Sequence, residues 1–141
     1  MATTRRATTQ WKGSFATGAG QVVLDSSDLG PFNVVAAVGP TETKGRTSPM
    51  ELLAAAHSAC VGITLAHMLA KSGRPAEWLD TSVEVDLDHT EGITGIRVTI
   101  RGVVPGVSDD EFASVGDLVA KSCPVSKALS GVEISLDAAL S

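Results

Sequence analysis

The segment from Pro49 to about Lys71 is apolar on nearly every side of a helical wheel, and it constrains the fold more than any other feature. It is too long for a β-strand. Polar residues, among them His57, Ser58, Thr64 and His67, interrupt it too often for a membrane span. A helix that is hydrophobic all round is normally buried in a protein core. We therefore expect a central buried helix with the rest of the chain wrapped around it.

Both ends of this helix carry sequence signals. Ser48 is placed to accept a hydrogen bond from the backbone N–H of Glu51, and the Glu51 carboxylate can reach back to the N–H of Ser48. Pro49 occupies the first helical position, where its missing N–H costs nothing. Gly73 fits the left-handed residue that ends many helices. Glu51 thus has a structural role as a capping residue.

Short apolar or alternating runs, separated by Gly- and Asp-rich turns, predict β-strands on both sides of the helix. The first two strands after the helix form a predicted hairpin with charged side chains on its outer face. One strand carries Glu84 and Asp86 and the other carries Arg97 and Arg101, and we expect these opposite charges to pair across the strands. The predicted strands span residues 11–15, 20–24 and 32–38 before the helix, then 81–89, 93–103 and 132–140 after it.

Two shorter helices are predicted near the end of the chain. The first starts at Ser108, has acidic residues in its first turn and runs to about Ser122. Pro124 then forces a break before a helix over residues 125–129. The predicted order is β-β-β-α-β-β-α-α-β, an α+β fold with helices packed on antiparallel sheet. We expect a single domain over residues 1–141, with residues 1–8 as a flexible tail.

Composition excludes several classes of function. The chain has 141 residues, of which 43% are hydrophobic and 19% are charged, so it can bury one core and is not disordered. Its net charge of -5, with only Arg5 and Arg6 adjoining as basic residues, argues against binding nucleic acid or a membrane surface. The N-terminus lacks a signal-peptide core, so we expect a cytoplasmic protein. A disulfide in that compartment would be transient and chemical.

Cys60 lies about a dozen residues into the apolar helix, where a cysteine is most often a small core hydrophobe. The helix dipole cannot activate it, because that effect fades within the first turn. His57, Thr64 and His67 lie on the same side, so the helix presents a polar seam. The seam either satisfies a core network or lines a cleft, and spacing leaves both open.

Cys123 stands directly before Pro124, at or beside the N-cap of the short helix, where exposed N–H groups favour a thiolate. An incidental capping residue is the competing interpretation. Two cysteines without a CxxC motif form a reversible disulfide only if the fold brings them together. Spacing along the chain does not decide that.

Two long motifs surround the cysteines. The stretch from Thr47 to Cys60 resembles the first-cysteine motif of the OsmC/Ohr family, and the stretch from Lys121 to Leu129 resembles its second-cysteine motif in the OsmC style. Residues 91–96 and 104–107 also match OsmC members. The resemblance extends over nearly the whole chain from Trp11.

The resemblance implies an intertwined α+β homodimer with two active sites near the subunit interface. It implies a peroxidase in which Cys60 becomes a sulfenic acid and Cys123 condenses with it as a disulfide, which protects the sulfenate from over-oxidation. Bulky organic hydroperoxides are the expected substrates, in oxidative or osmotic stress defence. No metal, haem or flavin is needed, and electrons come from an external dithiol or lipoyl-type reductant.

The group that activates Cys60 departs from the family pattern. The family usually has a glutamate ten residues before the first cysteine, where this chain has Met50. Glu51 is the nearest acidic residue, about 100° further round the helix. The family also places an arginine on the N-terminal sheet or its loops, but this chain has no basic residue between Lys12 and Lys44. Arg46 is the nearest substitute, and Lys44 is second.

Three other functions compete with the peroxidase. A non-catalytic member of the family would bind a small apolar ligand at the subunit interface. Metal binding would use His57, Cys60 and His67, although only the first two are adjacent on the helix. A hydrolase would use Cys60 with His57, but neighbours three residues apart on a helix rarely align for proton transfer.

Overall fold

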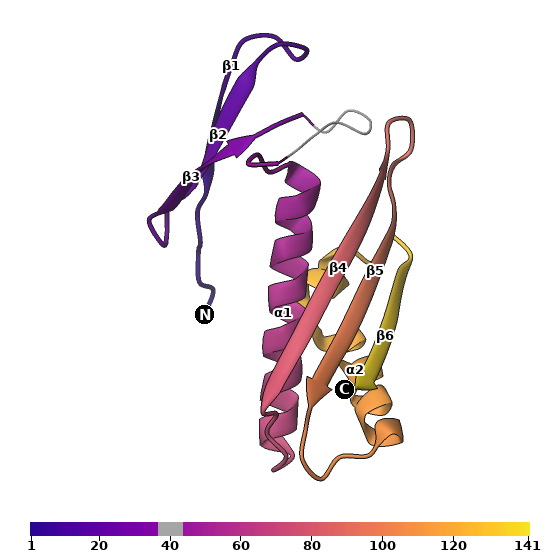
Figure 1. Cartoon of the computed structure of the whole chain (residues 1–141). Helices are drawn as coiled ribbons and strands as arrows, with labels where there is room; N and C mark the ends of the chain where they lie inside the picture. The colour runs from indigo at the N-terminus through magenta and orange to yellow at the C-terminus, as the bar shows by residue number, and fades with distance from the viewer. Residues whose placement is uncertain (37–43) are drawn as a thin grey trace. The chain divides into compact units, whose positions relative to one another are not determined.

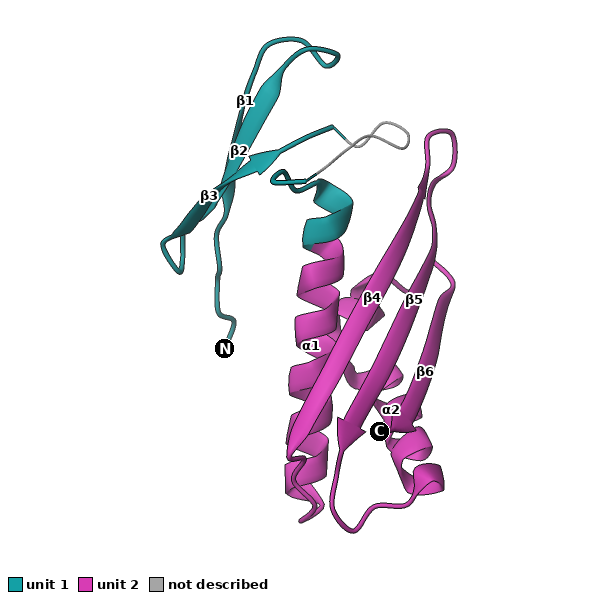
Figure 2. Cartoon of the chain, in the orientation of Figure 1, with its two compact units in different colours: residues 1–52 teal, residues 53–141 magenta. Residues whose placement is uncertain are grey.

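The computed structural model of the protein describes residues 1–36 and 44–141 and confirms the predicted α+β class and order of elements (Figure 1). The chain forms two compact units, residues 1–52 and 53–141, and the long helix begins in the first and continues in the second (Figure 2). The elements are β1 (Thr8–Lys12), β2 (Ala19–Leu24), β3 (Leu29–Val34), α1 (Pro49–Lys71), β4 (Trp78–Asp88), β5 (Gly92–Val103), α2 (Asp109–Ser122), α3 (Pro124–Ala128) and β6 (Ile134–Leu140).

The first unit is an antiparallel sheet in the order β1-β2-β3. β1 lies about three residues earlier than the predicted strand over residues 11–15, because the turn already begins at Gly13, whose φ of 97° is left-handed. Gly18 N–H closes this turn on the carbonyl of Ser14 at 2.7 Å. In the predicted strand over residues 32–38, positions 37 and 38 lie outside the described residues.

The start of α1 is tied to β3 within the first unit. Thr47 donates its N–H to the carbonyl of Asn33 at 2.7 Å and accepts from Val35 N–H at 2.8 Å. Ser48 accepts from the N–H of Glu51 at 3.3 Å, as predicted. The Glu51 carboxylate was expected to reach the N–H of Ser48, but its Oε1 accepts from the Thr47 hydroxyl at 2.6 Å. The cap therefore also locks the loop that leads into the helix.

The second unit has a mixed sheet in the order β4-β5-β6. β4 and β5 form the predicted antiparallel hairpin, whereas β6 pairs with β5 in parallel, unlike the antiparallel sheet we expected. Parallel neighbours need a crossover of about a dozen residues or more. The segment that contains α2 and α3 supplies that crossover and returns the chain to the end of the sheet from which β5 starts.

Helices α1 and α2 cover the same face of this sheet (Figure 1). Thr81 in β4 donates to the carbonyl of Ser58 in α1 at 2.8 Å, while Gly116 in α2 faces Ala138 in β6. The strands alternate, so that one face is apolar and the other is polar. The buried core consists of Val61, Leu65, Leu69, Ile96, Val98, Ile100, Val104, Phe112, Val119 and Cys123.

α1 is buried on one side only in the single chain. Its buried residues are His57, Val61, Leu65 and Leu69, which repeat every four residues, whereas Ile63 is 71% exposed. The burial on nearly every side that we expected is therefore not reached within one chain. Among the described residues, α1 is the one helix long and apolar enough to cross a membrane, but its buried side forms part of the protein core.

The polar face of the second sheet carries the predicted cross-strand ion pairs in part. Arg97 makes two contacts with Asp86, at 2.6 and 3.0 Å, and one with Glu84 at 3.4 Å. The hydrogen bonds from Arg97 and its positive charge lower the pKa of Asp86. Arg101 pairs with Asp137 at 2.9 Å, because the parallel β6 lies beside β5 on that side. These ion pairs link neighbouring strands of the sheet, and neither cysteine takes part in them.

We expect Gly116→Ala to destabilise the second unit. An added Cβ would lie 2.8 Å from the Cβ of Ala138, so α2 must move away from β6. Overpacking costs about 1–3 kcal/mol, which exceeds the gain of up to about 1 kcal/mol from replacing a helical glycine. Chemical denaturation should show a net loss of about 1 kcal/mol. Gly95→Ala is the control, since its nearest neighbour lies at 3.7 Å. Equal stability of both variants would contradict this account of the packing.

Candidate active site

The two cysteines meet in the second unit. The Sγ atoms of Cys60 and Cys123 lie 3.0 Å apart, and both thiols are free. α1 carries Cys60. Cys123 lies at the junction where α2 ends and α3 begins, and its N–H donates to Val119 of α2 while Pro124 starts the next helix. A disulfide measures about 2 Å between its sulfur atoms, so a movement of about 1 Å would bond this pair.

The two thiols differ in burial. Cys123 is fully buried, whereas Cys60 is half-buried at the edge of the same core. This difference follows from the rotation of α1, since Val61 faces the core and Cys60 is about 100° away from it. Cys60 is therefore the more accessible thiol for a molecule from solution.

The pKa of the Cys60 thiol is raised. Burial contributes most, and the hydrogen bond with Cys123 adds to it. The N–H of Val125 and the hydroxyl of Thr64 act in the opposite direction but do not outweigh these effects. Within this chain, Cys60 is therefore held mainly as a thiol rather than a thiolate.

The pKa of Cys123 is lowered, as expected for a residue at a helix N-terminus. Burial alone would raise it, but the hydrogen bond with Cys60 and the N–H and hydroxyl of Ser126 together outweigh burial, and Val125 N–H adds to them. The predicted capping position of Cys123 is confirmed. Because the thiols are in contact, they titrate as a pair, and the first negative charge of the pair resides mainly on Cys123.

His57 belongs to a polar network beside this pair. Its Nε2 lies 2.7 Å from the Oγ of Ser126 in α3, and both side chains are buried. Burial lowers the pKa of His57, so the ring is neutral near pH 7. Sequence reasoning singled out His57 but missed Ser126, because a serine three residues after a cysteine carries no signal until the helix places it beside that cysteine.

The polar residues predicted to share one side of α1 do not share one environment. His57 turns into the core toward Ser126, while His67 is exposed. Across residues 1–36 and 44–141, no three His, Cys, Asp or Glu side chains are grouped so as to hold a metal ion. The His57 bond to Ser126 also differs from the Cys–His contact that the hydrolase alternative needs. These positions give no support to either competing function.

Arg46 and Glu51 lie together in the first unit. Both line a hollow of about 510 Å³ against β3, beside Thr47, whose hydroxyl donates to Glu51. The cysteines belong to the second unit. The expected action of Arg46 and Glu51 on Cys60 stays a prediction.

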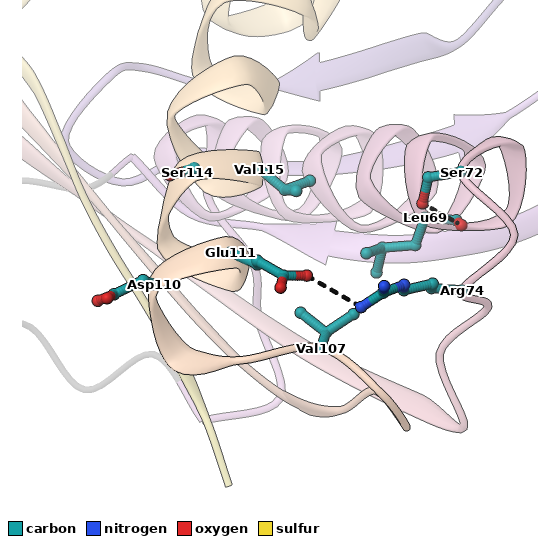
Figure 3. A pocket seen from close by; sticks show the side chains of 8 residues that line it. All are labelled: Leu69, Ser72, Arg74, Val107, Asp110, Glu111, Ser114 and Val115. Carbon is teal, nitrogen blue, oxygen red and sulfur yellow. Dashed lines mark hydrogen bonds and ion pairs between the residues drawn. The ribbon is translucent and has the colours of Figure 1, made fainter.

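A second hollow of about 510 Å³ lies in the second unit, between the end of α1 and the start of α2. Figure 3 shows Arg74 and Glu111 pointing toward each other there, and their side chains form an ion pair at 3.0 Å. Arg74 also donates to the carbonyl of Gly106. These contacts tie the loop before α2 to the end of α1, and neither cysteine lines the hollow.

Known proteins share both the sequence and the fold. The family model described as OsmC-like protein matches residues 41–137. Peroxiredoxin OsmC of Escherichia coli K12 is 33% identical over 132 residues, which cover 90% of each chain. The OsmC-like protein of Mycoplasma pneumoniae is 18% identical and covers 99% of each chain with a TM-score of 0.78. An organic hydroperoxide resistance protein OsmC from Legionella pneumophila is 21% identical with a TM-score of 0.71 and covers 100% of this chain and 98% of its own. The match to the family and the identity to the Escherichia coli protein show that this chain belongs to the OsmC-like family.

Proposed function

We propose that the protein is a thiol peroxidase that reduces organic hydroperoxides to alcohols through a Cys60 sulfenate and a Cys60–Cys123 disulfide, as part of oxidative or osmotic stress defence. The contact of 3.0 Å between two free thiols from distant parts of the chain is the observation that carries this proposal. The name of the Escherichia coli relative, a peroxiredoxin, and that of the Legionella protein, which concerns organic hydroperoxide resistance, support it.

The reaction needs two thiols and no cofactor. The Cys60 thiolate attacks the distal oxygen of the hydroperoxide, the O–O bond breaks, and the alkoxide leaves and takes a proton to become an alcohol. The Cys123 thiolate then attacks the sulfur of the sulfenic acid, and hydroxide leaves and takes a proton to become water. An external dithiol, of the lipoyl type or another, reduces the disulfide by two exchange steps.

The unequal burial of the thiols supports this division of roles. Cys60 is accessible to a hydroperoxide, whereas Cys123 is fully buried and meets only what forms on Cys60. The lowered pKa of Cys123 suits a thiol that must attack the sulfenate before a second hydroperoxide does. A proton shift across the 3.0 Å contact moves the charge to Cys60 for the first step.

The raised pKa of Cys60 means that the first step needs further activation. Arg46 is the cation proposed to stabilise the thiolate, and Glu51 is proposed to orient the Arg46 guanidinium. Their position along one hollow of the first unit supports their acting together. A cation beside a thiolate lowers its pKa by about one to three units.

The apolar outer side of α1 supports a homodimer. Ile63 is 71% exposed on a largely apolar helix, and the first unit exposes Phe15 at 71% and Leu29 at 54%. Contiguous exposed apolar surface is typical of protein–protein interfaces. A second copy of the chain is the proposed partner. An apolar site near such an interface would favour bulky hydroperoxides, because their alkyl part becomes buried. We propose that this reaction takes place in the cytoplasm.

A catalytically weak protein that binds a small apolar ligand at the dimer interface is the alternative function. The raised pKa of Cys60 favours it, because a thiol that stays protonated reacts slowly with hydroperoxides.

Titration of the reduced protein with cumene hydroperoxide decides between the two functions. We expect about two thiols to be consumed per chain, with a Cys60–Cys123 disulfide as the product in peptide mass spectra. Cys60→Ser should lower turnover by more than about 1,000-fold. Cys123→Ser should leave a sulfenic acid that dimedone traps. If both thiols stay reduced after one equivalent of hydroperoxide at neutral pH, the proposed peroxidase function is wrong and the ligand-binding function is favoured.

Arg46→Ala should slow the reaction of Cys60 with hydroperoxide. Loss of the cation raises the pKa of Cys60, so the thiolate fraction and the second-order rate constant should fall by about tenfold or more. Glu51→Gln should have a smaller effect in the same direction. Lys12→Ala, which removes another cation of the first unit, is the control, and stopped-flow measurement follows the first step. If Arg46→Ala and Glu51→Gln react as fast as Lys12→Ala, neither Arg46 nor Glu51 activates Cys60.

Ile63→Glu should convert the dimer into a monomer that remains folded. The substitution places a charge on the exposed apolar side of α1, where it would have to be buried against a second copy. Leu118→Glu on α2, where Leu118 is 51% exposed, is the matched control and should stay dimeric. Light scattering after size-exclusion chromatography gives the mass, and circular dichroism gives the fold. A wild-type monomer, or a dimeric Ile63 variant, would contradict this interface.

A further inference from the structure

The proposed reaction does not use His57, although this histidine is fully buried beside the cysteine pair. Its Nε2 lies 2.7 Å from Ser126 Oγ. Its Nδ1 is also buried and has no hydrogen-bond partner among the residues that the structure describes. A buried titratable side chain with one satisfied nitrogen and one unsatisfied nitrogen needs a physical reason.

The unpaired Nδ1 determines which nitrogen carries the proton. A buried N–H without an acceptor is rarer in folded proteins than an acceptor without a donor. The neutral ring therefore carries its proton on Nε2 and leaves a lone pair on Nδ1. Burial keeps the ring neutral, because it lowers the pKa of His57. His57 thus donates to Ser126 Oγ across the 2.7 Å contact.

The hydroxyl proton of Ser126 is then available to another acceptor. Cys123 is the N-cap of α3, and Ser126 is the third residue of that helix, which places its side chain next to that of the capping residue. Lys127 N–H closes this turn on the carbonyl of Cys123 at 3.0 Å. The Ser126 hydroxyl is one of the groups that lower the pKa of Cys123, and the Cys123 sulfur lies 3.0 Å from that of Cys60.

We propose that His57 and Ser126 are positioning residues for the resolving step: the Nε2–H of His57 orients the Ser126 hydroxyl so that it donates to the Cys123 sulfur and holds it as a thiolate. This inference rests on the proposed peroxidase function. The chain of donors runs one way, from His57 through Ser126 to Cys123, and ends on the atom that attacks the sulfenate.

The resolving step balances without a proton from this network. The S–O bond of the Cys60 sulfenic acid breaks as the S–S bond forms, and hydroxide leaves and becomes water with a proton from the buffer. His57 and Ser126 keep their protons throughout. A lower pKa raises the thiolate population but makes each thiolate a weaker nucleophile. On a logarithmic scale, the loss of nucleophilicity is only about half of the gain in population. The network therefore accelerates resolution wherever the thiol would otherwise stay protonated.

Titration of a single thiolate tests the network directly. In the Cys60→Ser background, Cys123 is the only cysteine, and because the chain has no tyrosine, the rise in ultraviolet absorbance reports its thiolate. We expect Ser126→Ala and His57→Leu each to lower the thiolate fraction about tenfold at a pH below the midpoint. His57→Gln, which keeps an N–H donor, should restore most of the loss. Ser122→Ala, which removes an exposed hydroxyl next to Cys123, is the control.

A single-turnover experiment tests the consequence for the reaction. With Cys60 and Cys123 both present, Ser126→Ala should slow the conversion of sulfenate to disulfide about threefold, because the higher nucleophilicity of the remaining thiolate offsets about half of the tenfold loss on a logarithmic scale. The oxidation of Cys60 should not be slowed, because negative charge on Cys123 raises the pKa of Cys60, and the variant lowers that charge. A variant that was merely misfolded would slow both steps, and thermal unfolding identifies such a variant.

The two experiments separate failure of this inference from failure of the peroxidase. The thiolate titration needs no hydroperoxide, so a shifted midpoint supports the network even if turnover is absent. An unchanged midpoint in both the Ser126 and His57→Leu variants would overturn it, even if turnover is rapid. Equal losses in His57→Leu and His57→Gln would also overturn it, because packing rather than the N–H would then be responsible.

Discussion

The packing of one side of α1 against the core of the second unit positions Cys60 and His57. Val61, Leu65 and Leu69 repeat at four-residue intervals and are fully buried, so the rotation of the helix about its axis is determined. Cys60, one residue before Val61, is thereby held at the edge of the core. His57, one turn earlier on the buried side, is held inside it. A helix that could rotate would not keep a sulfur atom 3.0 Å from a partner on another helix.

Burial has opposite outcomes at the two sulfur atoms because their neighbours differ. Both thiols lose solvent, which by itself raises the pKa of each. Cys123 stands at a break between two helices, where N–H groups and the Ser126 hydroxyl replace the lost water. Cys60 lies within a helix whose own N–H groups are already bonded, so it has fewer donors. The chain therefore stabilises charge on the buried thiol of Cys123 more than on the more accessible thiol of Cys60.

Much of this arrangement was predictable from sequence, because it depends on local patterns. An all-round apolar run too long for a strand predicted α1, alternation predicted the β4–β5 hairpin, and Pro124 after Cys123 predicted the break before α3. The direction of β6 was not predictable, because strand alternation is the same in parallel and antiparallel pairs. The exposed strand β1 was displaced for a similar reason, since none of its residues is buried and no alternating pattern marks its ends.

The features that sequence could not predict are those that depend on contacts between distant segments. Ser126 becomes a partner of His57 only because α3 folds back against α1, over a separation of 69 residues. The same contact explains why a neutral histidine remains in an apolar core: replacing it with a hydrophobic residue would leave the Ser126 hydroxyl free to turn away from Cys123. The side of α1 that carries Ile63 has the opposite character, because this large apolar side chain is 71% exposed. The inward side of this helix thus determines where Cys60 and His57 lie, and its outward side leaves Ile63 exposed.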